Sequence, residues 1–323
     1  MKNKKNIIIT LFLIILMFTL TGCNKNPEDL VKPITGFTEF WDIFVYPMAG
    51  IMWVVGKTIG FGNYPLTIIF STLIVRTIAW PIYGKTNDMQ LKMQLVQPEM
   101  EKIQKKYEGK DDEASKQRMS METMQLYKKY GIGLGGCLMP FIQMPLFIGF
   151  YRTISRMPYS IKETGNWIGS IFKTTEIFGI DMVLQQNQAF NELGEIIEAT
   201  GWTTQKIGVL VLAILVGITQ LISIILSNMR QKKQQENQVS NIPEYRRPKQ
   251  TDQQQMTAKT MKFMLYFMAF MMVMFVWQSA AGLGLYWVVG NIYSTFQTWL
   301  GQVGTEKRLE KLKQKQMSKG RIQ

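Results

Sequence analysis

The chain has 323 residues, with 37 Lys and Arg against 23 Asp and Glu, a net charge of +14 and no histidine. The lack of histidine removes a common general base and the usual nitrogen ligand for zinc. Two cysteines, Cys23 and Cys137, are too few for a cysteine-based metal cluster or a disulfide framework. The composition therefore predicts no cofactor and argues against an enzyme, although Ser/Lys or carboxylate pairs stay open as catalytic groups.

The N-terminus has the pattern of a secretory signal. Three lysines precede an apolar run from Ile7 to Leu20, and Thr21 and Gly22 then lead to Cys23. This arrangement resembles the bacterial lipoprotein box, so residues 1–22 are predicted to be removed and Cys23 to carry the lipid. The alternative is an uncleaved anchor helix with an incidental cysteine. Residues 23–36 are predicted to form a polar tether outside the membrane.

The next two segments differ in how they are expected to meet the bilayer. Residues 37–60 are apolar but rich in Trp, Tyr and Phe, which favours a helix lying on the outer membrane surface. Residues 64–83 number about 20, enough to cross the hydrocarbon core, and are predicted to be the first span. One arginine, Arg76, lies inside this span.

Residues 84–130 are polar and have a helical pattern. Apolar residues recur at steps of three and four, which indicates an amphipathic helix; they are Met89, Met93, Val96, Met100, Ile103 and Tyr107. A Gly-Lys-Asp-Asp turn signal at 109–112 separates this helix from a second one. The segment is therefore predicted to be an antiparallel helical hairpin in the cytoplasm.

The remainder of the chain alternates between apolar and polar segments, so the predicted fold class is an all-α integral membrane protein with five transmembrane helices. The four further spans are predicted at 131–152, 206–227, 261–278 and 282–301. The segments between and after them are predicted to be an external loop at 153–205, a cytoplasmic loop at 228–260 and a basic cytoplasmic tail at 302–323.

The distribution of positive charge predicts the topology. The hairpin has ten Lys and Arg, and the stretches 230–259 and 307–321 have seven each. The stretches 24–57 and 156–204 have three each and contain more acidic than basic residues. Because cytoplasmic loops are rich in Lys and Arg, the mature N-terminus is predicted outside and the C-terminus inside, as the secretory signal also requires. The spread of basic residues over three segments disfavours specific nucleic-acid binding.

Several stretches of the sequence resemble the YidC/Oxa1/Alb3 family of membrane protein insertases, in its short, lipoprotein form typical of Gram-positive-type bacteria. These stretches are Tyr64–Ile69, Arg76–Pro81, Gly135–Pro145 and Gly284–Asn291, and the resemblance covers about residues 37–302. The order of the elements also matches: an outer amphipathic helix, a span, a cytoplasmic hairpin and four further spans.

This resemblance implies a water-filled groove, open to the cytoplasm and to lipid, that binds client proteins. Arg76, Gln143, Gln220, Trp287 and Asn291 are the expected groove residues. No Asp or Glu lies in another predicted span, but Arg76 snorkelling to the headgroups or forming a structural salt bridge stays open. The glutamines could instead hydrogen-bond helix to helix, and Trp287 could be a packing aromatic.

The predicted function is insertion and folding of client proteins in the bacterial plasma membrane. Nascent membrane proteins and membrane lipids are the expected partners, and the Sec translocon, targeting factors or the ribosome could meet the basic cytoplasmic segments. A small-solute transporter or ion channel is the alternative, but no internal repeat of spans is visible. A membrane-bound hydrolase or acyltransferase would need a catalytic pair inside the spans, and none is evident.

Overall fold

The computed structural model describes residues 34, 37, 40–110, 112–132, 139–157, 171–191, 196–239 and 252–302. The signal, Cys23, the tether apart from Ile34, Cys137 and the basic tail after Gln302 lie outside the described residues. The described residues form two compact units. Unit 1 contains residues up to Phe70, Leu146–Leu210 and Phe275–Leu285, and unit 2 contains Ser71–Pro145, Val211–Met274 and the residues from Tyr286 onward.

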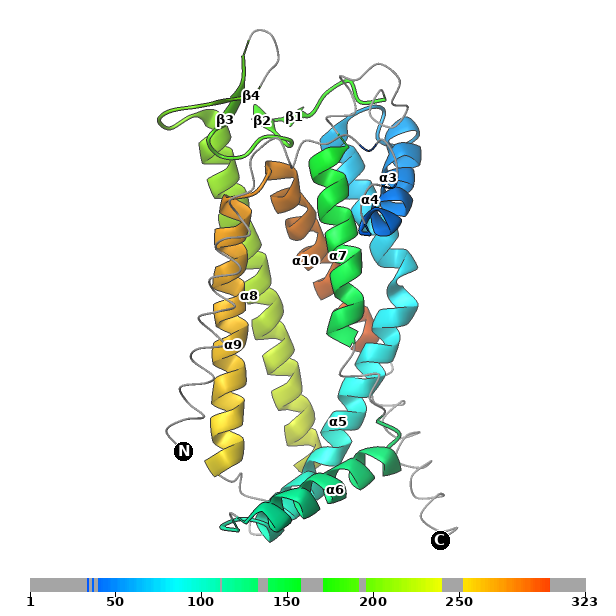
Figure 1. Cartoon of the computed structure of the whole chain (residues 1–323), viewed down its shortest axis with the longest axis vertical. Helices are drawn as coiled ribbons and strands as arrows, with labels where there is room; N and C mark the ends of the chain where they lie inside the picture. The colour runs from blue at the N-terminus through cyan, green and yellow to red at the C-terminus, as the bar shows by residue number, and fades with distance from the viewer. Residues whose placement is uncertain are drawn as a thin grey trace. The chain divides into compact units, whose positions relative to one another are not determined.

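The described part of the chain is mostly helical, which agrees with the predicted class at that level (Figure 1). Its helices are α3 (Asp42–Lys57), α4 (Tyr64–Ile78), α5 (Trp80–Lys106), α6 (Glu113–Lys129), α7 (Met139–Arg156), α8 (Thr204–Val239), α9 (Asp252–Trp277) and α10 (Ala281–Gln302). By length and composition, one described helix could cross a membrane, from Thr204 to Arg230. Tyr64–Ile78 and Lys262–Trp277 are shorter apolar helices.

Two pairs of short antiparallel strands depart from the all-α prediction, and both lie in the segment predicted as an external loop. Strand β1 (Glu176–Ile177) pairs with β2 (Ile180–Asp181). Strand β3 (Gln188–Phe190) pairs with β4 (Ile196–Glu198). Gln205, in the first turn of α8, accepts a hydrogen bond from the amide of Asp181 and donates to the carbonyl oxygens of Asp181 and Leu184, so this segment is attached to α8.

The core of unit 1 forms where α3, α4 and α7 approach closely. The hydroxyl of Tyr64 donates to the carbonyl oxygen of Ile154 at 2.7 Å. A Cβ atom at Gly149 would lie 3.0 Å from the backbone oxygen of Phe44, so only glycine lets α7 approach α3 this closely. Thr153, one turn later, donates to the carbonyl oxygen of Val45 at 3.3 Å. Small side chains on α7 therefore set the spacing between these two helices.

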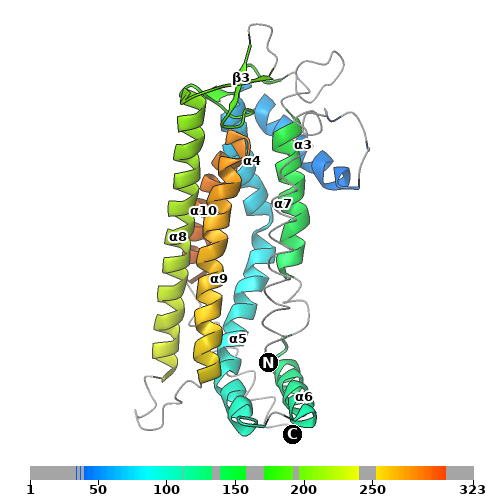
Figure 2. The same ribbon diagram turned by 60° about the vertical axis from the view of Figure 1, so that its left-hand side comes forward.

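Unit 2 contains two helix pairs. Helices α5 and α6 pack around Val96, Leu126 and Ile132. The carboxylate of Asp112 caps α6 by accepting a hydrogen bond from the amide of Ser115, as an N-cap residue should. Helices α8 and α9 run side by side in both views (Figures 1 and 2), and a Cβ at Gly217 would lie 2.8 Å from Val273.

Candidate functional site

Arg76 is half-buried and contacts α10. Its Nη1 donates to the hydroxyl of Ser294 at 2.8 Å. Its guanidinium also lies against Gly290, where a Cβ atom would be 2.8 Å from Nη2. One residue further along α4, the hydroxyls of Thr77 and Tyr293 are hydrogen-bonded at 2.8 Å. The lack of a side chain at Gly290 therefore gives the guanidinium its place beside α10.

The other expected groove residues of α10 lie on the same unit. Trp287 is buried, and Asn291 follows it one helical turn later. The Asn291 side chain donates to the hydroxyl of Thr219 on α8 at 3.2 Å. Gln220, the next residue of α8, is half-buried. Helix α10 thus links α4, through Ser294, with α8, through Asn291.

Gln143 is the expected groove residue of α7. It lies in α7, in the part that belongs to unit 2, and its side chain is outside the description. The structure therefore places Arg76 of α4 against α10, the helix that carries Trp287 and Asn291. The groove itself stays a prediction.

Further buried polar side chains extend this region along α4 and α10. Thr72 lies one turn before Arg76, and Gln297 lies three residues after Ser294, so each shares a helix face with it. Ser71 and Gln297 are buried, and Ser71 Oγ and Gln297 Nε2 have no hydrogen-bond partner among the described residues. Buried polar atoms of this kind are common binding places for ordered water. Sequence patterns do not distinguish these residues, because Ser, Thr and Gln occur in many helices.

A buried ion pair in unit 1 was also missed. Arg156 Nη1 lies 2.6 Å from Asp42 Oδ1, and the two residues are 8% and 0% exposed. The prediction put Arg156 in the external loop, but it is the last residue of α7. The pair joins the first turn of α3 to the end of α7.

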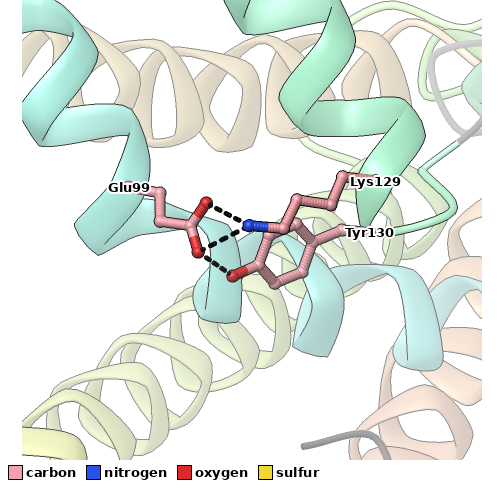
Figure 3. A network of polar contacts seen from close by, with 3 residues as sticks. All are labelled: Glu99, Lys129 and Tyr130. Carbon is pink, nitrogen blue, oxygen red and sulfur yellow. Dashed lines mark hydrogen bonds and ion pairs between the residues drawn. The ribbon is translucent and has the colours of Figure 1, made fainter. Parts of the chain in front are cut away.

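The hairpin of α5 and α6 carries a polar network on its surface (Figure 3). Glu99 accepts a hydrogen bond of 2.6 Å from the hydroxyl of Tyr130 and forms an ion pair of 3.2 Å with Lys129. Burial opposes ionisation of Glu99, but the hydrogen bonds from Tyr130 and Lys129 and the charge of Lys129 outweigh it and lower the pKa of Glu99 below its ordinary value. Burial and the neighbouring Glu99 together raise the pKa of Tyr130 to about 12.

The apolar stripe predicted on the hairpin is largely used inside it. Met89, Met100 and Ile103 pack against the hairpin core, whereas Met93 is exposed. Helix α6 exposes Met121 and Met124. Among the hairpin side chains that the structure describes, these three methionines offer exposed apolar surface to a partner, whereas most of the stripe does not. Among the described residues, no group of three or more His, Cys, Asp or Glu is placed to hold a metal ion.

Comparison with known proteins identifies relatives over most of the chain. Residues 53–308 match the family described as 60Kd inner membrane protein. The chain is 35% identical over 165 residues to membrane protein insertase YidC 2 of Bacillus anthracis, covering 51% of this chain and 63% of that protein. It is 29% identical over 303 residues to membrane protein insertase MisCA of Bacillus subtilis (strain 168), covering 92% and 91%.

A third relative, membrane protein insertase YidC of Oceanobacillus iheyensis, is 38% identical over 162 residues, which cover 49% of this chain and 61% of that protein. The match to MisCA thus extends along nearly the whole of both proteins. The matches to the two YidC proteins span less than two thirds of each relative's length.

Proposed function

This chain belongs to the 60Kd inner membrane protein family, as its resemblance to YidC/Oxa1/Alb3 predicted, and we propose that it is an insertase for client proteins of the bacterial plasma membrane. The observation that carries the proposal is Arg76, a charged side chain in a predicted span, seated against Gly290 and Ser294 of α10. The names of the three relatives support the same activity.

The proposed mechanism has no chemical step. Acidic residues in the part of a client that must cross the membrane are attracted to the guanidinium of Arg76, because a charge in a low-dielectric site acts strongly. Water bound at Ser71 and Gln297 shortens the apolar barrier for that polar segment. The client's hydrophobic segment then moves into lipid, driven by transfer of apolar surface out of water.

The remaining groove residues have proposed roles in the same process. Asn291 and Gln220 offer polar groups between α8 and α10, and Trp287 supplies a rigid apolar surface. Gln143 is proposed to line the groove from α7. A transporter or channel stays the alternative class, but nothing in the described residues favours it over an insertase.

The proposed topology has five spans, an outer mature N-terminus lipidated at Cys23, and a cytoplasmic C-terminus. The Lys- and Arg-rich cytoplasmic segments are proposed to meet the ribosome, targeting factors or the Sec translocon. Lipidation has a direct test: the Cys23→Ala variant should lose metabolic labelling by fatty acid. If this variant were still labelled, Cys23 would not be the lipidated residue.

Reconstitution into liposomes tests the activity. Liposomes that contain only this protein should insert a client with an acidic translocated tail, as measured by protease protection of that tail. Arg76→Ala should reduce the protected fraction, and Arg76→Lys should largely keep it, since the charge is retained. A client with a neutral tail is the matched control and should be less affected. Equal insertion by empty liposomes would exclude the proposed function.

A further inference from the structure

Two Phe-Gly dipeptides in unit 1 adopt the same unusual turn. In β1–β2, Phe178 and Gly179 connect Ile177 to Ile180, and their φ angles are 53° and 73°. Between α3 and α4, Phe61 and Gly62 have φ angles of 50° and 75°. Positive φ at both central residues defines a type I′ turn, in which Asn-Gly or Gly-Gly is usual.

A phenylalanine at the first central position of such a turn is unfavourable. Its Cβ clashes with the backbone in the left-handed region, which is why bulky residues there are outliers. Within the part of the chain that the structure describes, these rings gain little packing that would offset the strain, since Phe61 is 79% and Phe178 is 91% exposed. Strain kept at two places, each with an exposed aromatic ring, indicates that both rings contact something outside the chain.

The two turns belong to one hydrogen-bonded assembly. Gly62 accepts a backbone hydrogen bond from Lys173 at 2.7 Å, and Tyr64 donates to Thr174 at 2.9 Å. The chain continues from Thr174 directly into β1, so the Phe61 turn is hydrogen-bonded to the segment that carries the Phe178 turn. Their positions are therefore fixed with respect to each other within unit 1.

The Phe178 turn is also seated on the outer end of α8, the helix long and apolar enough to span. A Cβ at Gly179 would lie 3.5 Å from Thr204, the first residue of α8. Further along α8, Ile180 packs so closely on Gly208 that no side chain would fit there. The exposed ring of Phe178 is thus held at the level where α8 begins.

Trp202 indicates that the start of α8, where Phe178 is held, lies at a membrane–water interface. It precedes α8 and is 70% exposed, and the ammonium of Lys206 lies over its ring, 5.3 Å from the ring centroid. Exposed apolar side chains of α8 begin directly afterwards with Ile207. Trp beside a cation at the end of an apolar helix is the usual composition of the interfacial region.

We propose that Phe61, Phe178 and Trp202 form an aromatic rim that inserts into the outer leaflet and fixes the depth of unit 1 in the bilayer. The proposal rests on the membrane topology given above but needs no client. Continuity with the apolar surface of α8 identifies lipid as the occupant. Insertion of the two rings into lipid also explains why phenylalanine stands in turns that Asn or Gly would fit with less strain.

Spin labels can measure the depth of each rim residue. Single cysteines are introduced at Phe61, Phe178 and Trp202 in a protein whose own two cysteines are replaced, and the labelled protein is reconstituted into phosphatidylglycerol-containing bilayers. Collisions with oxygen should exceed collisions with a water-soluble nickel chelate at all three positions. Asn187, an exposed polar residue between β2 and β3, is the matched control and should show the reverse.

A photoactivatable phenylalanine analogue at positions 61 and 178 gives a second measurement that keeps an aromatic ring in each turn. Lipid adducts should exceed those from position 187 at least tenfold. Preferential access to the nickel chelate at 61 and 178 would overturn the proposal, and so would crosslinks to protein in place of lipid. Loss of client insertion with the labels still at lipid depth would contradict the proposed function and leave the rim intact.

Discussion

At the scale of single residues, the buried ion pair of Asp42 and Arg156 is expected to have a strong effect on the stability of unit 1. Taking two charges out of water is costly, and close contact at 2.6 Å offsets that cost only while both partners are present. Removal of one partner leaves the other charge buried among α3 and α7. The pair therefore determines where α3 attaches to α7.

We expect Asp42→Asn to destabilise unit 1 by about 3–5 kcal/mol, the usual cost of breaking a buried ion pair. Thermal unfolding of the detergent-solubilised protein would measure this effect. The double variant Asp42→Asn, Arg156→Gln is the control, because it removes both buried charges and should regain part of the loss. A single variant as stable as the unchanged protein would show that the pair does not hold α3.

Gly290 has a different role, because its contact is with the flexible end of Arg76. A Cβ introduced by Gly290→Ala would displace the guanidinium rather than the backbone, so stability should change little while client insertion falls. Gly50→Ala is the matched control, since no atom lies within 4 Å of the added Cβ. Protease protection of an acidic client tail measures both variants. Unchanged insertion by Gly290→Ala would mean that the exact position of Arg76 is unimportant.

At the scale of elements, the hairpin of α5 and α6 repeats one motif on both helices. Lys106 and Tyr107 follow Glu99 in the sequence. Lys129 and Tyr130 follow Glu122 at the same spacing. Each glutamate is bound by the Lys-Tyr pair of the other helix: the distances from Glu122 to Lys106 and Tyr107 are 2.6 and 3.0 Å. The two ends of the antiparallel pair are therefore held by equivalent contacts.

These contacts make the hairpin sensitive to acid. Hydrogen bonds from Lys106 and Tyr107 lower the pKa of Glu122. Hydrogen bonds from Tyr130 and Lys129 lower the pKa of Glu99, although burial opposes this effect. A carboxyl whose pKa is lower in the folded state than in the unfolded state stabilises the fold. This stabilisation is fully present at a pH above the unfolded-state pKa and is lost as the pH falls through the folded-state pKa. Hydrogen exchange of the hairpin amides should therefore accelerate as the pH falls below about 4.5, after correction for intrinsic exchange rates.

Glu101 supplies the control, because its pKa is shifted in the opposite direction to those of Glu99 and Glu122. Burial raises its pKa, against the opposing effect of Lys105, and its Oε2 is buried with no hydrogen-bond partner among the described residues. At neutral pH its charge is therefore unfavourable, so Glu101→Gln should slow exchange of the hairpin amides, whereas Glu99→Gln should accelerate it. If both substitutions changed exchange in the same direction, the network around Glu99 would not stabilise the hairpin.

The bounds of the elements show what sequence patterns could and could not predict. The apolar run of α8 was predicted at 206–227, but the helix continues to Val239, because Gln, Lys and Glu favour helices without being apolar. The first span was predicted to end at 83, whereas α4 ends at Ile78 and α5 begins at Trp80, with Pro81 in its first turn. Hydrophobicity alone does not indicate such helix ends.

The β1–β2 turn and the buried ion pair could not be predicted from the sequence, for physical reasons. The β1–β2 turn uses Phe-Gly, which lacks the Asn or Asp that usually signals a type I′ turn. Asp42 and Arg156 are 114 positions apart, so no local pattern relates them. By contrast, Arg76 could be selected from the sequence because a charge in an apolar run is costly wherever the fold places it.

At the scale of the whole molecule, the distribution of charge predicts which segments face the cytoplasm. Residues 85–129, 230–259 and 307–321 carry the excess of Lys and Arg, and the strand-containing segment after α7 is acidic. The positive-inside rule then puts Asn187 outside and both Glu108 and Glu236 inside. All three residues are exposed in the structure, so cysteines introduced there should be accessible to reagents.

Single-cysteine variants at these three positions test the arrangement in intact cells. A membrane-impermeant maleimide should label Asn187→Cys directly and should label Glu108→Cys and Glu236→Cys only after permeabilisation. A cell-permeant maleimide is the control and should label all three, which excludes local shielding. Labelling of Glu108→Cys together with Asn187→Cys in intact cells would place the hairpin outside, where neither the basic hairpin nor Arg76 could serve clients arriving from the cytoplasm.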